Sequence, residues 1–143
     1  MSLFGNQASG HARDYPPLNL FSWAGYRVAE VERELQQLVQ TVCGPLEVVP
    51  TDHAAYVFSG NPPKKFGVAW ICDRQIRGFY RLVEECGVTP VQIADALDAL
   101  RDAYAKNHNA ERYTATIAQR SVVVTVSESL QKDVHSIIDE MQH

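Results

Sequence analysis

The chain has 143 residues, of which 45% are hydrophobic and 21% charged, and its formal net charge at pH 7 is −4. This length suits one ordinary domain and this composition is that of folded proteins, so neither intrinsic disorder nor a disulfide scaffold is indicated. The three cysteines, Cys43, Cys72 and Cys86, show no C-x-x-C spacing, and we expect them to be reduced and mostly buried.

Compartment and charged partners can also be inferred from the composition. No apolar run approaches the roughly 18 to 20 residues that span a bilayer, and no secretory signal pattern opens the chain. We therefore expect a cytoplasmic protein with no membrane partner. The net acidity argues against nucleic acid as a partner, because proteins that bind it usually carry clustered Lys and Arg.

The N-terminal 1–20 stretch lacks sustained periodicity, which predicts an arm, either flexible or docked, ahead of a single α+β domain over 21–143. The apolar residues at the end of this arm and just after it are Leu18, Leu20, Phe21 and Trp23. Because so many large apolar side chains are costly to leave in water, we expect this part to dock on the protein's own core.

The first half of the domain is predicted to contain one helix and three strands. Apolar residues recur at every third or fourth position over 26–42, which is typical of an amphipathic helix. Two β-prone runs, 46–50 and 54–59, are separated by a loop of hairpin length, and the apolar run 66–72 indicates a buried strand.

Two helices are expected next. Asp73 is a good N-cap, and the apolar spacing after it predicts a helix that ends at Gly87. Thr89 followed by Pro90 and Gln92 matches a capping box, so a second helix should begin there and run for about 16 residues.

The last part of the chain predicts two strands and a helix. The 112–118 run alternates apolar and polar residues, 121–126 is rich in valine, and the short link between them favours antiparallel pairing. Ser127 then caps an amphipathic helix. The predicted fold is α+β, in the order α-βββ-αα-ββ-α, with a mostly antiparallel sheet of about five strands packed by helices on one face.

The stretch "IRGFYRLVEECGVTPVQIADAL", residues 76–97, resembles the first two helices of the phage-repressor type of helix-turn-helix domain. The resemblance implies DNA binding through a segment over 74–106. In that family a turn after the second helix leads to a recognition helix. Here "DALRDAYAKN" continues the second helix through that point, which favours a structural corner between two helices.

Catalytic candidates are few. Asp52 and His53 lie in the predicted hairpin loop, where His53 could transfer protons at neutral pH, although both residues are also ordinary turn formers. Cys72 lies where a strand gives way to a predicted helix whose N-terminus could lower the thiol pKa, although a cysteine there is more often a core residue. The histidines show no metal-binding spacing, so we expect no metal and no cofactor.

Two sets of cations are candidate anion or ligand contacts. Lys64 and Lys65 lie in the loop "SGNPPKK", which lacks a phosphate-binding glycine pattern. Arg74, Arg77 and Arg81 would lie along one face of the predicted helix that begins at Asp73, although charged residues on a helix are usually just solvated.

Three functional hypotheses follow. The absence of every enzymatic signature favours a binding or regulatory domain that acts on a protein partner or by forming a homodimer, without catalysis. The alternative is a small-molecule-binding protein, or a small enzyme, with a pocket near His53 or Cys72. DNA binding through the segment 74–106 is the least favoured of the three.

Overall fold

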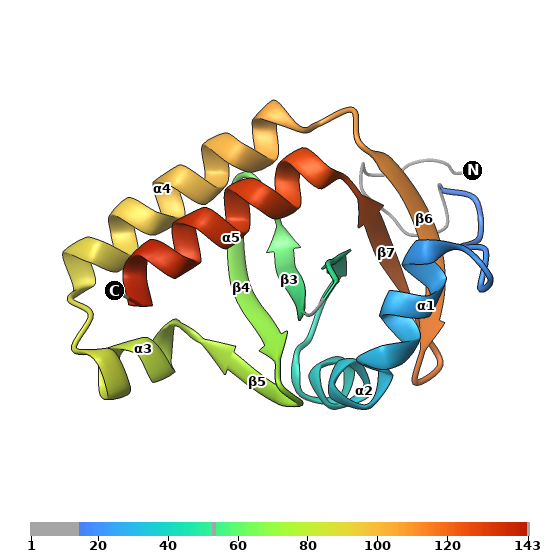
Figure 1. The fold of residues 1–143 in the computed structure, drawn as a ribbon, viewed down its shortest axis with the longest axis horizontal. Coiled ribbons are helices and arrows are strands. Elements are labelled where there is room, and N and C mark those ends of the chain that lie inside the picture. Colours follow the sequence, from blue (N-terminus) through green and yellow to red (C-terminus); the bar gives the residue numbers. More distant parts are fainter. Residues whose placement is uncertain (1–14, 53, 143) are drawn as a thin grey trace.

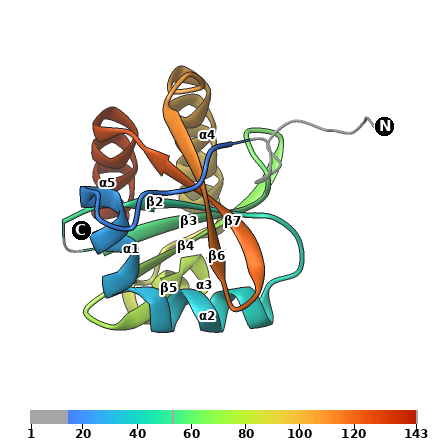
Figure 2. The same cartoon turned by 90° about the vertical axis from the view of Figure 1, so that its right-hand side faces the viewer.

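The computed structural model describes residues 15–52 and 54–142. Its centre is a six-stranded sheet in the order β5-β4-β3-β2-β7-β6, with helices on both faces (Figures 1 and 2). The fold is therefore α+β, as predicted, but the sheet has one strand more than expected, and the helices do not all lie on one face.

The strands form two antiparallel groups that meet at one parallel pairing. The strands are β2 (Leu46–Pro50), β3 (Ala54–Asn61), β4 (Lys65–Cys72), β5 (Gln75–Gly78), β6 (Glu111–Ile117) and β7 (Arg120–Val126). β2 to β5 form a meander of antiparallel neighbours, and β6 pairs antiparallel with β7. β2 and β7 are parallel, so the sheet is mixed.

The helices divide between the two faces of the sheet. They are α1 (Trp23–Glu30), α2 (Glu32–Thr41), α3 (Phe79–Cys86), α4 (Pro90–Lys106) and α5 (Glu128–Gln142). Figure 2 shows α1 and α2 on one face and α4 and α5 on the other. Within the described ranges, no helix is both long enough and apolar enough to cross a membrane.

Two hydrophobic clusters result, because successive side chains of a strand point to opposite faces. On β3, Ala55 and Val57 belong to the cluster under α1 and α2, while Tyr56 and Phe58 belong to the cluster under α4 and α5. All four side chains are buried. Burial on both faces explains why the central strands are continuous apolar runs in the sequence.

The prediction that a helix begins directly after Asp73 is wrong. Residues 73 and 74 form the two-residue turn of a hairpin in which β5 pairs with the end of β4, and α3 begins only at Phe79. Asp73 and Arg74 have φ angles of 53° and 62°, which suit a turn with two left-handed residues. Neither residue is a glycine, so the usual sequence signal of this turn is missing.

The helix predicted over 26–42 is two helices. α1 and α2 meet at Val31, whose φ of −112° and ψ of 15° interrupt the helix. The apolar spacing continues across the break because both helices pack on the same cluster, which is why the sequence suggests one helix.

The capping predictions at Thr89 and Ser127 are confirmed, whereas the one at Asp73 is not. Thr89 accepts a hydrogen bond from the Gln92 amide, and the Gln92 side chain accepts one from the Thr89 amide, which closes the capping box. Ser127 accepts from the Leu130 amide at the start of α5. After Thr89, α4 continues unbroken to Lys106, and β6 follows where a helix-turn-helix domain would place its recognition helix.

The arm prediction is only partly tested, because residues 1–14 lie outside the described residues. Pro17 forms a parallel bridge with Thr114 on edge strand β6, and Leu18 is buried. Leu20 and Phe21, however, are 69% and 83% exposed, so the expectation that the whole apolar stretch docks on the core is wrong.

Candidate functional site

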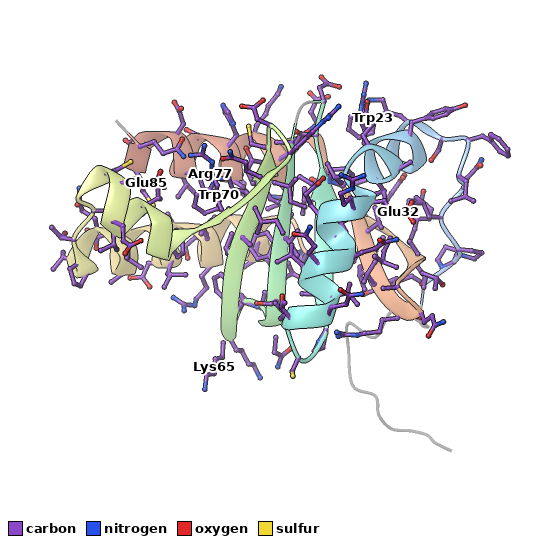
Figure 3. The ribbon with its side chains drawn as sticks, turned by 90° about the horizontal axis from the view of Figure 1, so that it is seen from below. Trp23, Glu32, Lys65, Trp70, Arg77 and Glu85 are labelled. Atoms are coloured by element: carbon purple, nitrogen blue, oxygen red, sulfur yellow. The ribbon has the colours of Figure 1, made fainter. Side chains whose placement is uncertain are left out.

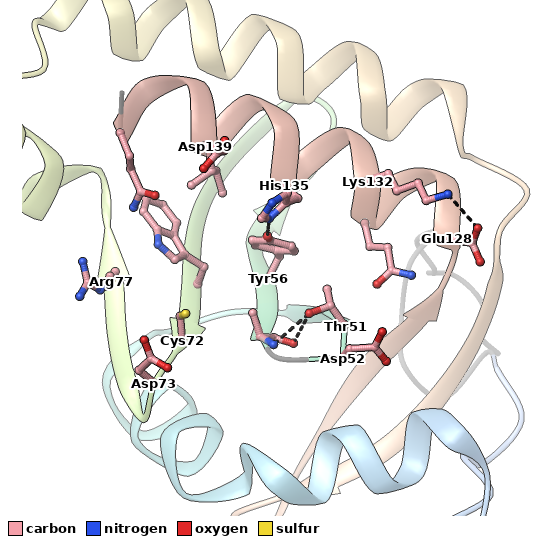
Figure 4. A pocket seen from close by; sticks show the side chains of 15 residues that line it. Thr51, Asp52, Tyr56, Cys72, Asp73, Arg77, Glu128, Lys132, His135 and Asp139 are labelled. Carbon is pink, nitrogen blue, oxygen red and sulfur yellow. Dashed lines mark hydrogen bonds and ion pairs between the residues drawn. The ribbon is translucent and has the colours of Figure 1, made fainter.

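A cavity of about 800 Å³ lies between α5 and the sheet, at the end where the β2–β3 loop and the β4–β5 turn meet (Figure 4). We call it the α5 groove. From α5 it is lined by Glu128, Gln131, Lys132, His135, Ile138, Asp139 and Gln142. This spacing of three and four residues marks one helix face, and over the 15 residues of α5 it makes the groove roughly 21 Å long.

The opposite wall comes from the loops that join the strands. Thr51 and Asp52 belong to the β2–β3 loop, Cys72 and Asp73 lie at the β4–β5 turn, and Arg77 lies on β5. The Thr51 hydroxyl accepts from the Ala54 amide at 2.9 Å and donates to the Ala54 carbonyl at 2.9 Å, which fixes the loop that carries Asp52.

The floor of the groove is aromatic. Tyr56 on β3 and Trp70 on β4 are cross-strand partners, and each is almost fully buried, with 4% and 3% of its surface exposed. Trp70 also packs edge to face on Phe79, with ring centroids 5.9 Å apart. A rigid apolar floor with polar walls is the usual construction of a ligand site.

Tyr56 and His135 connect the floor to the helix wall. The phenol oxygen of Tyr56 and Nδ1 of His135 are 2.9 Å apart and share a hydrogen bond (Figure 4). Burial raises the pKa of Tyr56 to about 12, and the charges of Asp139 and, at high pH, of the Cys72 thiolate act in the same direction. The phenol is therefore neutral at physiological pH.

Carboxylates outnumber cations around the groove. Asp52, Asp73, Glu128 and Asp139 face Arg77 and Lys132, which leaves a formal charge of −2 with His135 neutral. Glu128 pairs with Lys132 at 3.0 Å, and Asp52 lies 3.6 Å from Arg27. The electrostatic preference of the groove is for a cationic or donor-rich ligand.

Cys72 lies in the groove, but in a different environment from the one predicted. A turn follows it rather than a helix, so no helix N-terminus lowers the thiol pKa. Burial raises the pKa of Cys72, and the charge and hydrogen bond of Asp73 raise it further, while Arg77 lowers it. A protonated thiol is a poor nucleophile, which argues against Cys72 as a catalytic group.

The structure brings together some of the predicted site residues and separates others. Asp52, Cys72 and Arg77 meet in the α5 groove. His53 lies outside the described residues. Lys65 lies at the other end of β4, as Figure 3 shows, and its neighbour Lys64 is exposed in the β3–β4 turn.

The predicted row of arginines on one helix face does not exist. Arg74 lies in the β4–β5 turn, Arg77 on β5 and Arg81 on α3, because the chain is extended up to Gly78. The side chain of Arg81 lies outside the described part. The three cysteines are free, but the expectation that they are mostly buried is wrong, since Cys43 and Cys86 are exposed and Cys72 is only partly buried.

Sequence reasoning missed Tyr56 and His135. They are 79 residues apart in the chain, and "AAYVFS" has the pattern of an ordinary buried strand. The only available signal was the polar face of the last helix, where Gln131, His135 and Asp139 recur at intervals of four.

Neither a search for metal-binding clusters nor a comparison with known proteins indicates the chemistry of the groove. Among the residues with described positions, no group of three or more His, Cys, Asp or Glu side chains could hold a metal ion. No protein-family model, curated protein or solved structure was found to match this chain.

Proposed function

We propose that this protein is a non-catalytic binding domain that takes an extended, basic segment of a partner protein into the α5 groove. The observation that carries the proposal is that the groove follows α5 from Glu128 to Gln142. An extended chain rises about 3.3 Å per residue, so a groove of this length accommodates roughly six residues of a partner.

The composition of the groove supports the same occupant. The buried rings of Tyr56 and Trp70 offer an apolar floor for one side of an extended segment. The excess of carboxylates on the walls favours Lys or Arg on the other side. Because the pKa of Cys72 is raised, the groove offers contacts for binding more readily than a nucleophile for catalysis.

The proposal can be tested with peptides selected on the full chain. Phage-displayed random dodecapeptides are panned against the protein, and the selected peptides are synthesised and measured by calorimetry. We expect selected peptides to be rich in Lys and Arg, and Asp139→Lys to weaken their binding by about tenfold or more, since one close charge contact contributes on that scale.

Glu140→Lys is the matched control, because this exposed residue is adjacent to Asp139 but does not line the groove. It introduces the same charge change and should leave peptide binding within about twofold of wild type, as expected for a distant exposed charge. Equal losses in both variants, or selected peptides without basic residues, would count against the proposal.

A small molecule is the second candidate occupant, and the cavity volume favours it. About 800 Å³ lies within the range of roughly 300–1,000 Å³ that is typical of small-molecule sites. Native mass spectrometry of the freshly purified protein distinguishes the two. A retained adduct of defined small mass that is lost in Asp139→Lys would favour a small cationic molecule, whereas a bare protein that binds the selected peptides would favour the partner segment.

A further inference from the structure

A second cavity, of about 940 Å³, lies at the opposite end of the same sheet. Its lining includes the β3–β4 turn region, the start of β2 and the end of α4, and it shares no lining residue with the α5 groove. We call it the β3–β4 cavity. Figure 3 shows Lys65 at this end of the molecule and Trp70 with Arg77 toward the other.

A buried ion pair forms part of the wall of the β3–β4 cavity. Arg112 on β6 donates from Nε to Oε2 of Glu47 on β2 at 3.2 Å, and the two side chains are only 9% and 12% exposed. Tyr104 donates its hydroxyl to Oε1 of Glu47 at 2.6 Å, and the Thr125 hydroxyl donates to Oε2. The charge of Glu47 is thus satisfied within the protein.

The guanidinium of Arg112 is held in place by several contacts. Its Nη1 donates to the carbonyls of His108 and Ala110, at 2.9 and 3.3 Å, and its Cζ lies 5.5 Å from the centroid of the Tyr104 ring. The side chain lines the cavity and 9% of its surface is exposed. A fixed guanidinium in a cavity wall is suited to charge-assisted contact with a carboxylate.

The charge balance of this cavity is opposite to that of the α5 groove. Arg112 and Lys65 line it together with a single carboxylate, Glu47, which leaves a formal charge of +1 with His108 neutral. Arg112 and Glu47 balance each other's charge in their ion pair, so the net positive charge of the cavity is that of Lys65. This net charge favours an anion over a cation.

The rest of the wall is aromatic. Phe66, Phe58 and Tyr104 form a contiguous row, with ring centroids 5.8 Å apart in the first pair and 5.4 Å apart in the second. All three residues line the cavity, and Phe66 and Tyr104 are only partly buried. Rings with this spacing pack well against a further planar apolar group.

We propose that the β3–β4 cavity binds a small aromatic carboxylate, with its carboxylate at Arg112 and Lys65 and its ring against Phe66 and Tyr104, behind which the fully buried Phe58 completes the aromatic row. The inference rests on the fixed guanidinium, the positive charge balance and the aromatic wall, and it is independent of the function proposed for the α5 groove. It assigns this protein two sites of opposite charge preference on one face of its sheet.

The test uses 2-naphthoate as the probe and its neutral isostere 2-naphthamide as the comparison, each titrated into the full chain by calorimetry. We expect 2-naphthoate to bind about tenfold more tightly than the amide, because only the carboxylate forms charge-assisted hydrogen bonds. Lys65→Gln should weaken binding of 2-naphthoate several-fold. Lys64→Gln is the matched control, since Lys64 is the exposed neighbour that does not line the cavity.

Cysteine protection locates the bound probe without altering the buried ion pair. Cys43 lines the β3–β4 cavity, Cys72 lines the α5 groove and Cys86 lines neither. Saturating 2-naphthoate should slow alkylation of Cys43 and leave Cys86 unchanged. No binding of 2-naphthoate, equal binding of the amide, equal effects of the two lysine substitutions, or protection of Cys72 instead of Cys43 would each overturn the proposal.

Discussion

Tyr56 on β3 and His135 on α5 are joined by a hydrogen bond of 2.9 Å between the phenol oxygen and Nδ1. This hydrogen bond links the last helix of the chain to a central strand of the sheet, and it joins the floor of the α5 groove to its helix wall. Because burial raises the pKa of Tyr56 to about 12, the contact forms with a neutral phenol at physiological pH.

The raised pKa of Tyr56 predicts a loss of stability in strong base. An unfolded tyrosine titrates near pH 10 and folded Tyr56 near 12, so its contribution is complete below pH 10 and is lost as the pH rises through 12. Between pH 10 and 12, Tyr56→Phe should lose less unfolding free energy than wild type, by on the order of 2 kcal/mol.

Urea denaturation at pH 8, 10 and 11.5 measures this difference. Tyr104 will contribute to the alkaline loss in both proteins, because burial and Glu47 raise its pKa as well. Tyr26→Phe is the control, since Tyr26 is 58% exposed. Parallel pH profiles for wild type and Tyr56→Phe would show that Tyr56 is not protected in the folded protein.

The three cysteines should react at different rates with a thiol reagent at neutral pH. Cys43 and Cys86 are exposed, whereas Cys72 is only partly exposed and its pKa is raised by burial and by Asp73. Since the thiolate is the reactive form, we expect two fast modifications and one slow one. Mass spectrometry of tryptic peptides after timed alkylation assigns the rates, and rapid labelling of Cys72 would reopen the case for a catalytic thiol.

Local sequence signals predicted most of the helices and strands. The capping box at Thr89 and the hairpin on either side of 51–53 depend on neighbours within a few residues, so they can be identified without the fold. The β4–β5 turn could not, because Asp73 is both a good N-cap and a residue that tolerates a left-handed φ. Only the pairing of β5 with β4 decides between a helix start and a hairpin turn at this residue.

The candidate sites were much harder to predict than the fold. Asp52, Cys72 and Arg77 stand out in the sequence for separate local reasons, and no pattern in it indicates that they share a groove with α5. The Glu47–Arg112 pair was missed altogether, since 65 residues separate its members and each looks like an ordinary charged residue of a strand. Such contacts depend on the β2–β7 pairing, which no local pattern encodes.

Thr89→Ala should lower the free energy of unfolding by about 1 kcal/mol through the loss of the N-cap of α4. The Thr89 hydroxyl accepts from the Gln92 amide at 3.2 Å, and the alanine variant leaves that donor without its partner. Thr89→Ser keeps the hydroxyl and should stay within about 0.5 kcal/mol of wild type. Urea titrations of both variants test this, and equal losses would assign the effect to the threonine methyl group instead.

Leu18 should hold the arm against the edge strand. The Leu18 amide donates to the Thr114 carbonyl, and the Thr114 amide donates to the Pro16 carbonyl, each at 2.8 Å, so the arm covers part of the open edge of β6. Leu18→Asp puts a charge in a buried position and should release this contact, whereas Leu20→Asp, at an exposed position, should not.

Amide hydrogen exchange of Thr114 reports the release directly, and sedimentation velocity tests whether the uncovered edge promotes self-association. We expect faster exchange at Thr114 in Leu18→Asp only. Unchanged exchange would mean that Leu18 does not anchor the arm.

Gly25→Ala should destabilise the protein, although alanine normally stabilises a helix by about 1 kcal/mol relative to glycine. Gly25 lies within α1, and a Cβ there would come within 2.5 Å of the Asn19 carbonyl oxygen and 2.7 Å of the Leu20 backbone. The turn cannot yield easily, because the Ser22 amide and hydroxyl both donate to the Asn19 carbonyl, at 3.1 and 2.6 Å. We expect a net loss of roughly 1–3 kcal/mol from this overpacking.

Ser22→Ala removes one of those restraints, so the cost of Gly25→Ala should be smaller in the double variant. The losses of unfolding free energy of the two single variants, measured by urea denaturation, should therefore add up to more than the loss of the double variant. A higher urea midpoint for Gly25→Ala alone would show that the 19–22 turn does not pack against α1.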